Sequence, residues 1–166
     1  MGLPPESLFA EIYRIHGHRC PMSTLGGRLG FAARERLAGT APFSATYYIS
    51  TCAADGISVM TDCKKADGSL RIVEGERHAL WLKSHDGDGI FAELSSKALK
   101  LAGDYRALDQ ALQEEETNLS PDEQQLRRAA KNAAFEELLQ KLEAAEKETA
   151  SLRDQLKAIL EKALLR

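Results

Sequence analysis

Two histidines and a cysteine alternate with other residues in the segment HGHRCP, residues 16–21. Side chains two residues apart in an extended segment point to the same side, so His16, His18 and Cys20 can converge on one point. Pro21 favours the first position of a helix, because proline has no N–H to lose there. Cys20 is then the N-cap residue, where free backbone N–H groups and the helix dipole stabilise a thiolate. The pattern predicts a nucleophilic or metal-binding sulfur beside two imidazoles; the alternative is a loop with two solvated histidines and a small buried cysteine.

Further candidate ligands lie later in the chain. Cys52 and Asp55 follow a predicted strand, and Cys63 ends the short segment after it. Thiolates and imidazoles suit zinc, nickel, copper or iron better than magnesium or calcium. The cysteines lack the paired C-x-x-C spacing of a structural zinc site, so these ligands would be gathered from separate loops. Asp55 could bind the metal, hold the tautomer of a histidine, or cap a helix near Cys52.

Together these residues predict a transition-metal site, with zinc as the first candidate and nickel, iron or copper as alternatives. The predicted metal ligands are His16, His18, Cys20, Cys52, Asp55 and Cys63. Of these, Cys52 and Asp55 are expected to support the other four from nearby. The remaining histidines, His78 and His85, are interpreted as a packed strand residue and an exposed loop residue.

Composition limits the classes of protein to be considered. The 166 residues have room for one domain of ordinary size and an extension. With 43% hydrophobic but only 6% aromatic residues, the core must consist mainly of Leu, Ala, Ile and Val. The net charge of −3 argues against a nucleic-acid partner. No apolar run reaches about 18 residues, so we expect no membrane partner and a soluble, cytoplasmic protein. Three cysteines exclude a complete disulfide framework.

Helical periodicity predicts two helices around the His/Cys segment, over residues 4–15 and 22–37. The second contains Gly26, Gly27 and Gly30, each of which costs up to ~1 kcal/mol relative to alanine. The apolar period continues through these glycines, so a loop is the less favoured interpretation. We therefore expect another backbone to approach this helix closely, either within the domain or across a dimer.

β-Branched and aromatic residues predict a strand over 45–51, followed by a short helix over 53–62. Two further strands are predicted over 70–74 and 77–83, with a Gly-Glu turn between them. They are expected to pair antiparallel, with the strand at 45–51 joining them. The fold class is therefore α+β, with a small antiparallel sheet packed with helices, plus a long C-terminal helix.

The long C-terminal helix is predicted to begin at Ser120, because Ser120 and Glu123 form a capping box around Pro121. From there to residue 166 the chain has no Gly or Pro, and a heptad pattern continues over four repeats. Its a and d positions are Phe135, Leu138, Leu142, Ala145, Thr149, Leu152, Leu156, Ile159 and Ala163. A lone rod cannot bury this stripe, so the helix either pairs as a coiled coil with a second copy or folds back on its own domain.

Two shorter helices are predicted before this rod, over residues 90–101 and 105–116, separated by Gly103. The chain is accordingly divided into a metal-binding core over residues 1–116 and a C-terminal helix over residues 120–166.

Two motifs in the core together resemble the FmdE family, named after the E subunit of formylmethanofuran dehydrogenase. They are HGHRCP at 16–21, and TCAADGISVMTDC at 51–63 followed by GSLRIV at 68–73. The resemblance covers roughly residues 5–110 and implies an α+β domain, generally dimeric, with a transition-metal site near the His/Cys motif. Many family members carry a C-terminal zinc finger; this chain has no cysteine after Cys63, and the long helix takes its place. Family members usually have glycine where this chain has Met22 and Asp62.

Three functions follow from these observations. The first is a homodimeric, redox-linked metalloprotein of the FmdE-like family. The second is a metal-independent thiol enzyme, with Cys20 as the catalytic nucleophile, a neighbouring histidine as base and Cys63 or Cys52 as the resolving thiol. The third is an accessory module whose C-terminal helix docks a larger oxidoreductase.

Overall fold

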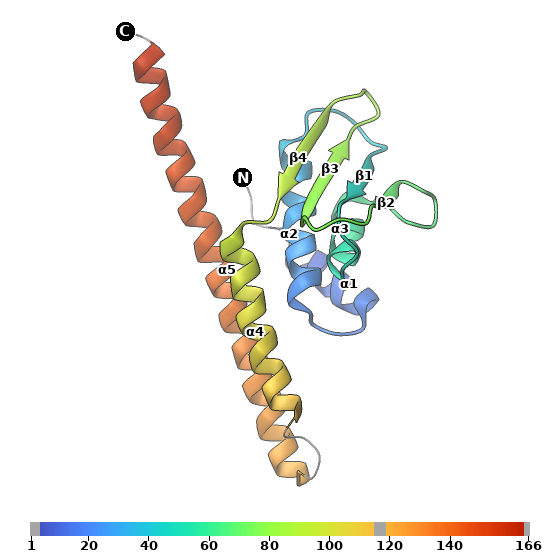
Figure 1. The fold of residues 1–166 in the computed structure, drawn as a ribbon, viewed down its shortest axis with the longest axis vertical. Helices are drawn as coiled ribbons and strands as arrows, with labels where there is room; N and C mark the ends of the chain where they lie inside the picture. Colours follow the sequence, from blue (N-terminus) through green and yellow to red (C-terminus); the bar gives the residue numbers. More distant parts are fainter. Residues whose placement is uncertain (1–3, 115–118, 165–166) are drawn as a thin grey trace. The chain divides into compact units, whose positions relative to one another are not determined.

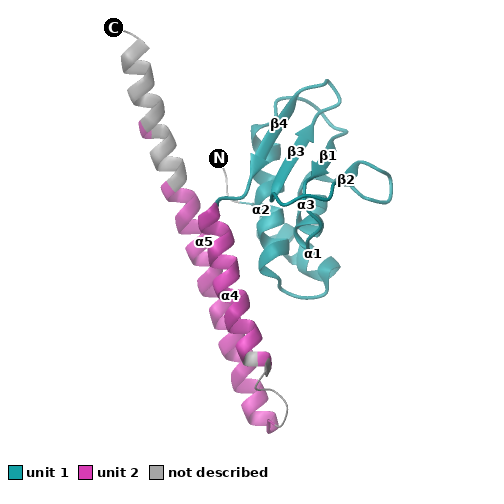
Figure 2. Ribbon diagram, in the orientation of Figure 1, with its two compact units in different colours: residues 1–95 teal, residues 96–166 magenta. Residues whose placement is uncertain are grey.

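The computed structural model describes residues 4–114 and 119–164, and the chain divides into two compact units (Figure 2). The first unit spans residues 1–95 and the second spans residues 96–166. The fold is α+β, as predicted. The predicted core extended to residue 116, whereas the helix that begins at Ser96 groups with the C-terminal helix.

The first unit begins with two helices and gains a third after its first strand (Figure 1). They are α1 (Glu6–His16), α2 (Pro21–Arg36) and α3 (Ala53–Thr61). Each helix begins and ends within two residues of its predicted range, because the apolar period and the flanking Pro and Gly residues are strong local signals. Buried residues of α2 and α3 share one apolar cluster with Tyr47, Leu80 and Leu82 of the sheet.

The sheet of the first unit has four strands in the order β2-β1-β3-β4. They are β1 (Ser44–Tyr47), β2 (Leu70–Ile72), β3 (Ala79–Lys83) and β4 (Gly89–Glu93). β1 pairs parallel with β2 and antiparallel with β3, and β3 pairs antiparallel with β4. The sheet is therefore mixed, and the prediction of an antiparallel sheet is wrong for β2.

The predicted hairpin between residues 70–74 and 77–83 is also wrong, because β1 lies between β2 and β3. Helix α3 connects β1 to β2, and a crossover helix of this kind lets neighbouring strands run parallel. The consequence for the site is direct: α3 must start where β1 has just ended, which places Cys52 at that end of the sheet.

Strand β4 replaces the first part of the helix predicted over 90–101. It follows β3 through a turn in which Gly87 has φ +95°, in the left-handed region that favours glycine. Ile90, Ala92 and Leu94 all pack against the core cluster, with a period of two that marks a strand. The helical period of the residues after Leu94 obscured this short signal in the sequence.

Helices α2 and α3 are in backbone contact, which accounts for the glycines of α2. A Cβ atom on Gly26 would lie 2.0 Å from the carbonyl oxygen of Ala53, and one on Gly30 would lie 3.3 Å from the Cα atom of Ile57. Both partners advance by four residues, so the two helices run parallel and their N-terminal ends lie side by side. The predicted close approach is thus confirmed, and it occurs within one chain.

The second unit is an antiparallel pair of helices, α4 (Ser96–Glu114) and α5 (Pro121–Leu164). Gly103 lies inside α4, so the two helices predicted on either side of it form one continuous helix. At the start of α5 the predicted capping box is confirmed: the N–H of Ser120 donates to Glu123 Oε2 at 2.8 Å, and the N–H of Glu123 donates to Ser120 Oγ at 3.4 Å. Within the described ranges, none of the helices combines the length and apolar character needed to cross a bilayer.

Part of the heptad stripe of α5 is buried against α4. Phe135 is almost fully buried, and its ring meets Tyr105 of α4 edge-on, with 5.2 Å between the ring centroids. Lys131 Nζ and Asp109 Oδ1 form an ion pair at 2.6 Å on the same hairpin. The heptad positions from Thr149 onward lie outside the residues whose side chains are described, so self-association through them stays a prediction.

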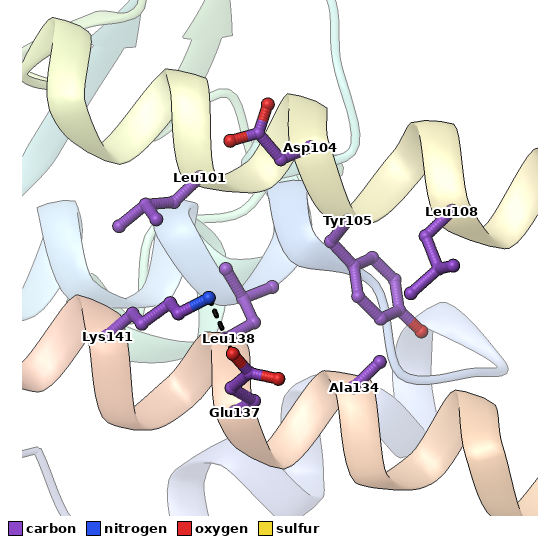
Figure 3. A pocket seen from close by; sticks show the side chains of 8 residues that line it. All are labelled: Leu101, Asp104, Tyr105, Leu108, Ala134, Glu137, Leu138 and Lys141. Atoms are coloured by element: carbon purple, nitrogen blue, oxygen red, sulfur yellow. Dashed lines mark ion pairs between the residues drawn. The ribbon is translucent and has the colours of Figure 1, made fainter.

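A pocket of about 150 Å³ lies between α4 and α5, and its lining is small and mixed in character (Figure 3). It is lined by Leu101, Asp104, Tyr105, Leu108, Ala134, Glu137, Leu138 and Lys141. The Nζ atom of Lys141 pairs with Glu137 Oε1 of the same helix at 2.6 Å, so these charges satisfy each other. The pocket contains no metal-ligating histidine or cysteine and is not part of the candidate site.

We expect Phe135→Ala to lower the free energy of unfolding of the helical hairpin by about 3–5 kcal/mol, the usual cost of removing a buried aromatic ring. Urea denaturation followed by far-ultraviolet circular dichroism measures this loss. Leu126→Ala is the matched control, because Leu126 lies on the same helix with 71% of its surface exposed and should change stability by less than about 0.5 kcal/mol. Equal effects of the two substitutions would contradict the packing of Phe135 against α4.

Candidate metal site

The His/Cys segment lies between α1 and α2. His16 is the last residue of α1, and Gly17 follows with φ +88°, a left-handed conformation that ends the helix and turns the chain. Cys20 is the N-cap of α2 and Pro21 is its first residue, which confirms both predicted positions. The turn at Gly17 departs from the extended segment on which the predicted convergence of His16, His18 and Cys20 was based.

Three potential metal ligands meet in the first unit. A ring nitrogen of His16 and the sulfur atoms of Cys20 and Cys52 all lie within 4.8 Å of one another. The cause is the packing described above: Cys20 and Cys52 are the N-cap residues of two helices that run parallel in backbone contact. Each sulfur therefore lies at a helix N-terminus, where the dipole favours a negative charge.

Asp55 holds the imidazole of His16 in place. The Asp55 Oδ2 atom lies 2.7 Å from His16 Nδ1. An ionised carboxylate only accepts hydrogen bonds, so Nδ1 carries the proton and donates it, which leaves a lone pair on Nε2. Of the three roles open to Asp55, this contact fits that of a residue that fixes the tautomer of a metal-binding histidine.

The Nε2 atom of His16 is buried and has no hydrogen-bond partner among the described residues. The side chain as a whole is only 12% exposed. A buried polar atom without a partner typically costs about 1–3 kcal/mol, and a metal ion coordinated by Nε2 would remove that cost. The residues present therefore fit a metal ion, with one imidazole nitrogen and two sulfurs available to bind it.

Cys52 is exposed as a residue, but partial burial of its thiol raises its pKa, and the neighbouring Cys20 raises that pKa further. Both effects disfavour the thiolate form of Cys52 when no cation is nearby. Metal binding at this position must therefore displace a proton from the thiol, which makes binding dependent on pH.

Two of the predicted ligands lie outside this group. The ring of His18 is 4.6 Å from that of His16, centroid to centroid, but no nitrogen of His18 belongs to the group. Cys63 is 0% exposed and its thiol donates to the carbonyl oxygen of Thr61 at 3.7 Å. Helix α3 separates Cys63 from Cys52 and, at 1.5 Å per residue, is about 13 Å long. The structure thus brings Cys52, expected only to support the site, to the place that was predicted for Cys63.

The two other histidines take the positions predicted for ordinary structural residues. His78 precedes β3, and its Nδ1 atom lies 2.9 Å from the hydroxyl of Tyr47. Burial lowers the pKa of His78, which favours the neutral ring that can accept this hydrogen bond. His85 is exposed in the turn between β3 and β4. Neither belongs to the group formed by His16, Cys20 and Cys52.

Comparison with known proteins adds the family. Residues 15–164 match the family model described as "FmdE, Molybdenum formylmethanofuran dehydrogenase operon". The chain belongs to the FmdE family. The resemblance inferred from HGHRCP and the motif at 51–63 is thereby confirmed.

A solved structure also matches this FmdE-family chain. It is an FmdE-like protein of the tungsten formylmethanofuran dehydrogenase type from Syntrophus aciditrophicus, with a TM-score of 0.51 and 20% sequence identity. The match covers 68% of this chain and 60% of the other chain, so the present sequence spans less than two thirds of its length. At this identity the likeness shows the fold alone. None of the curated proteins compared with the chain matches it.

One departure from the usual family sequence has a structural explanation. Asp62, where family members usually have glycine, ends α3 with φ 57°, in the left-handed region. Glycine adopts this conformation without strain, and aspartate is among the few other residues that tolerate it. The substitution therefore preserves the end of α3 and lies at the opposite end of that helix from Cys52.

We expect Asp55→Asn to weaken zinc binding by about 10- to 100-fold, the usual cost of losing a carboxylate that orients a metal-binding histidine. The amide keeps the shape of the side chain but removes the charge that holds the proton on Nδ1 of His16. Competition with a chromogenic chelator measures the change in affinity. Asp62→Asn is the control, because Asp62 is exposed at the far end of α3 and asparagine tolerates its backbone conformation. An Asp55→Asn protein that binds zinc as tightly as the unmodified chain would remove Asp55 from the site.

Proposed function

We propose that this member of the FmdE family is a transition-metal protein whose ligands are Nε2 of His16 and the sulfurs of Cys20 and Cys52. The observation that supports the proposal most strongly is the buried, unpartnered Nε2 atom, which belongs to a residue grouped within 4.8 Å of two free thiols. A structural histidine would normally satisfy this nitrogen with a protein hydrogen bond. Asp55 completes the arrangement by fixing the histidine tautomer.

Zinc is the metal that this ligand set suits best. Two thiolates and one imidazole are borderline-soft ligands, which zinc accepts readily, and nickel, iron and copper remain the alternatives. Three protein ligands are typical of a site that keeps one position for water or substrate, whereas structural zinc sites usually have four. A zinc ion in such a site supplies Lewis-acid polarisation of a bound oxygen.

The proposed chemistry belongs to the site and not to the chain's partners. Cys52 is exposed, so the group is reachable from solvent on its side of the first unit. A site that is both reachable and incompletely coordinated by protein suits metal-dependent catalysis or metal transfer. A redox-linked role in an oxidoreductase system is the finer form of the proposal, and it rests on the family name.

The proposal is tested by metal titration of the full chain, purified without an affinity tag and stripped with a chelator. We expect uptake of about one Zn²⁺ per chain in competition with a chromogenic chelator, and release of protons that a pH indicator detects. His16→Ala should lose this uptake, whereas His85→Ala, a change at an exposed histidine outside the group, should retain it. Unmodified protein that takes up no zinc, nickel, iron or copper would overturn the proposal.

A further inference from the structure

The two sulfurs of the site are free thiols held close to each other. The Sγ atoms of Cys20 and Cys52 lie within 4.8 Å, a gap that rotation about χ1 of either side chain can shorten. Their backbones are fixed by the contact of α2 with α3, where Gly26 meets the carbonyl of Ala53. A disulfide requires two Cβ atoms that face each other from backbones already close together, and these two N-cap positions lie side by side.

The three cysteines differ in their access to a dissolved oxidant. Cys52 is exposed and Cys20 retains 9% of its surface, whereas Cys63 is 0% exposed. Cys63 also lies at the opposite end of α3, beyond the reach of either sulfur in the site. Of the two resolving thiols open from the sequence, the structure therefore favours Cys52 over Cys63.

We propose that Cys20 and Cys52 form a reversible disulfide when a hydroperoxide oxidises the site in its metal-free form. One thiol attacks the peroxide O–O bond and becomes a sulfenic acid, and the peroxide leaves as water or an alcohol. The second thiol then attacks that sulfur, the S–S bond forms and one water molecule leaves. Two electrons pass from the two sulfurs to the peroxide, and both thiol protons end in the products. A dithiol reductant reverses the reaction by thiol–disulfide exchange.

Oxidation and metal binding compete for the same two sulfurs, a consequence that rests on the proposed function. The sulfurs cannot bind a metal ion and form a disulfide at once, so each event excludes the other. A bound zinc ion should protect the thiols, and oxidation should release the ion. The site would then be a redox-controlled metal site, with the hydroperoxide acting on the metal-free state.

Disulfide mapping on the full chain tests the inference. The chelator-treated protein is mixed with equimolar hydrogen peroxide, its remaining thiols are alkylated, and it is digested with trypsin and with a protease that cleaves before aspartate. Cleavage before Asp55 and Asp62 separates Cys52 from Cys63, which trypsin alone leaves in one peptide. We expect the peptides at 20–28 and 37–54 to be joined, the link to disappear with dithiothreitol, and Cys63 to be alkylated. Cys63→Ser should give the same link, and Cys52→Ser should give none.

Links through Cys63, links between chains, or sulfinic acid on Cys20 without a disulfide would each overturn the inference. Zinc-loaded protein should form the link about tenfold more slowly or slower still, since a metal-bound thiolate is withdrawn from the reaction. The two proposals fail in different ways. A Cys20–Cys52 link in a protein that never binds metal would refute the proposed function alone, and zinc uptake without a link would refute only the disulfide.

Discussion

Replacing Cys20 or Cys52 with serine is expected to lower the affinity for zinc by more than about 100-fold, beyond the usual cost of losing a residue that merely supports a ligand. A serine hydroxyl keeps its proton at neutral pH and offers a hard oxygen in place of a soft thiolate. Both sulfurs lie in the group with His16, so each single replacement should remove a ligand. Competition titration with a chromogenic chelator measures the affinity of each variant.

Cys63→Ser is the control for these two variants. Its thiol is buried at the other end of α3, so the replacement should leave zinc affinity within about threefold, even if the buried hydroxyl lowers stability by about 1–3 kcal/mol. A large loss of zinc on Cys63→Ser together with none on Cys52→Ser would restore the ligand set expected from the sequence and contradict the one in the structure.

Gly56→Ala is expected to lower the free energy of unfolding of the first unit by about 3 kcal/mol or more, at the upper end of the usual cost of overpacking. A Cβ atom at this position would lie 2.1 Å from the carbonyl oxygen of Ser23 and 2.3 Å from the backbone nitrogen of Gly27. These are backbone atoms, which cannot rotate away, so α2 and α3 would have to move apart. Urea denaturation measures the loss as a lower midpoint.

The same separation should also weaken metal binding, because the contact between α2 and α3 places Cys20 beside Cys52. Gly103→Ala is the matched control: Gly103 also lies inside a helix, but a Cβ atom there would meet nothing within 4 Å. That replacement should stabilise the chain by roughly 0.5–1 kcal/mol through helix propensity. Gly56→Ala protein with unchanged stability would contradict the backbone contact on which the site depends.

Local signals predicted the helices of the first unit and the start of α5. Proline at the first helical position, a glycine that ends α1 and the capping box at Ser120 each act within a few residues, so sequence alone reveals them. The glycines of α2 also predicted a close backbone contact. What they could not show was the partner, since nothing in α2 itself specifies that α3 is the helix in contact.

The errors have a common cause, which is that strand pairing and ligand grouping depend on contacts between distant residues. The parallel pairing of β2 with β1 follows from the crossover through α3, and the sequence of residues 70–72 carries no signal for it. Similarly, Cys52 and Cys63 looked equally able to join Cys20. Only the position of each at one or the other end of α3 distinguishes them.

The C-terminal helix shows the same limit. Its heptad pattern predicted a partner for the apolar stripe, and the structure supplies α4 as the partner around Phe135. A homodimer, docking on a larger oxidoreductase and a cytoplasmic location all stay predictions. Size-exclusion chromatography with light scattering would test the first of these on the full chain.

The measurement that tests the central claim most directly is X-ray absorption at the zinc edge of the zinc-loaded full chain. We expect two sulfur atoms at about 2.3 Å and at least one nitrogen at about 2.0–2.1 Å from the metal. With Cys52→Ser the sulfur count should fall from two to one, and with Cys63→Ser it should stay at two. A shell of nitrogen and oxygen atoms only, or one that Cys52→Ser leaves unchanged, would contradict a metal site formed by His16, Cys20 and Cys52.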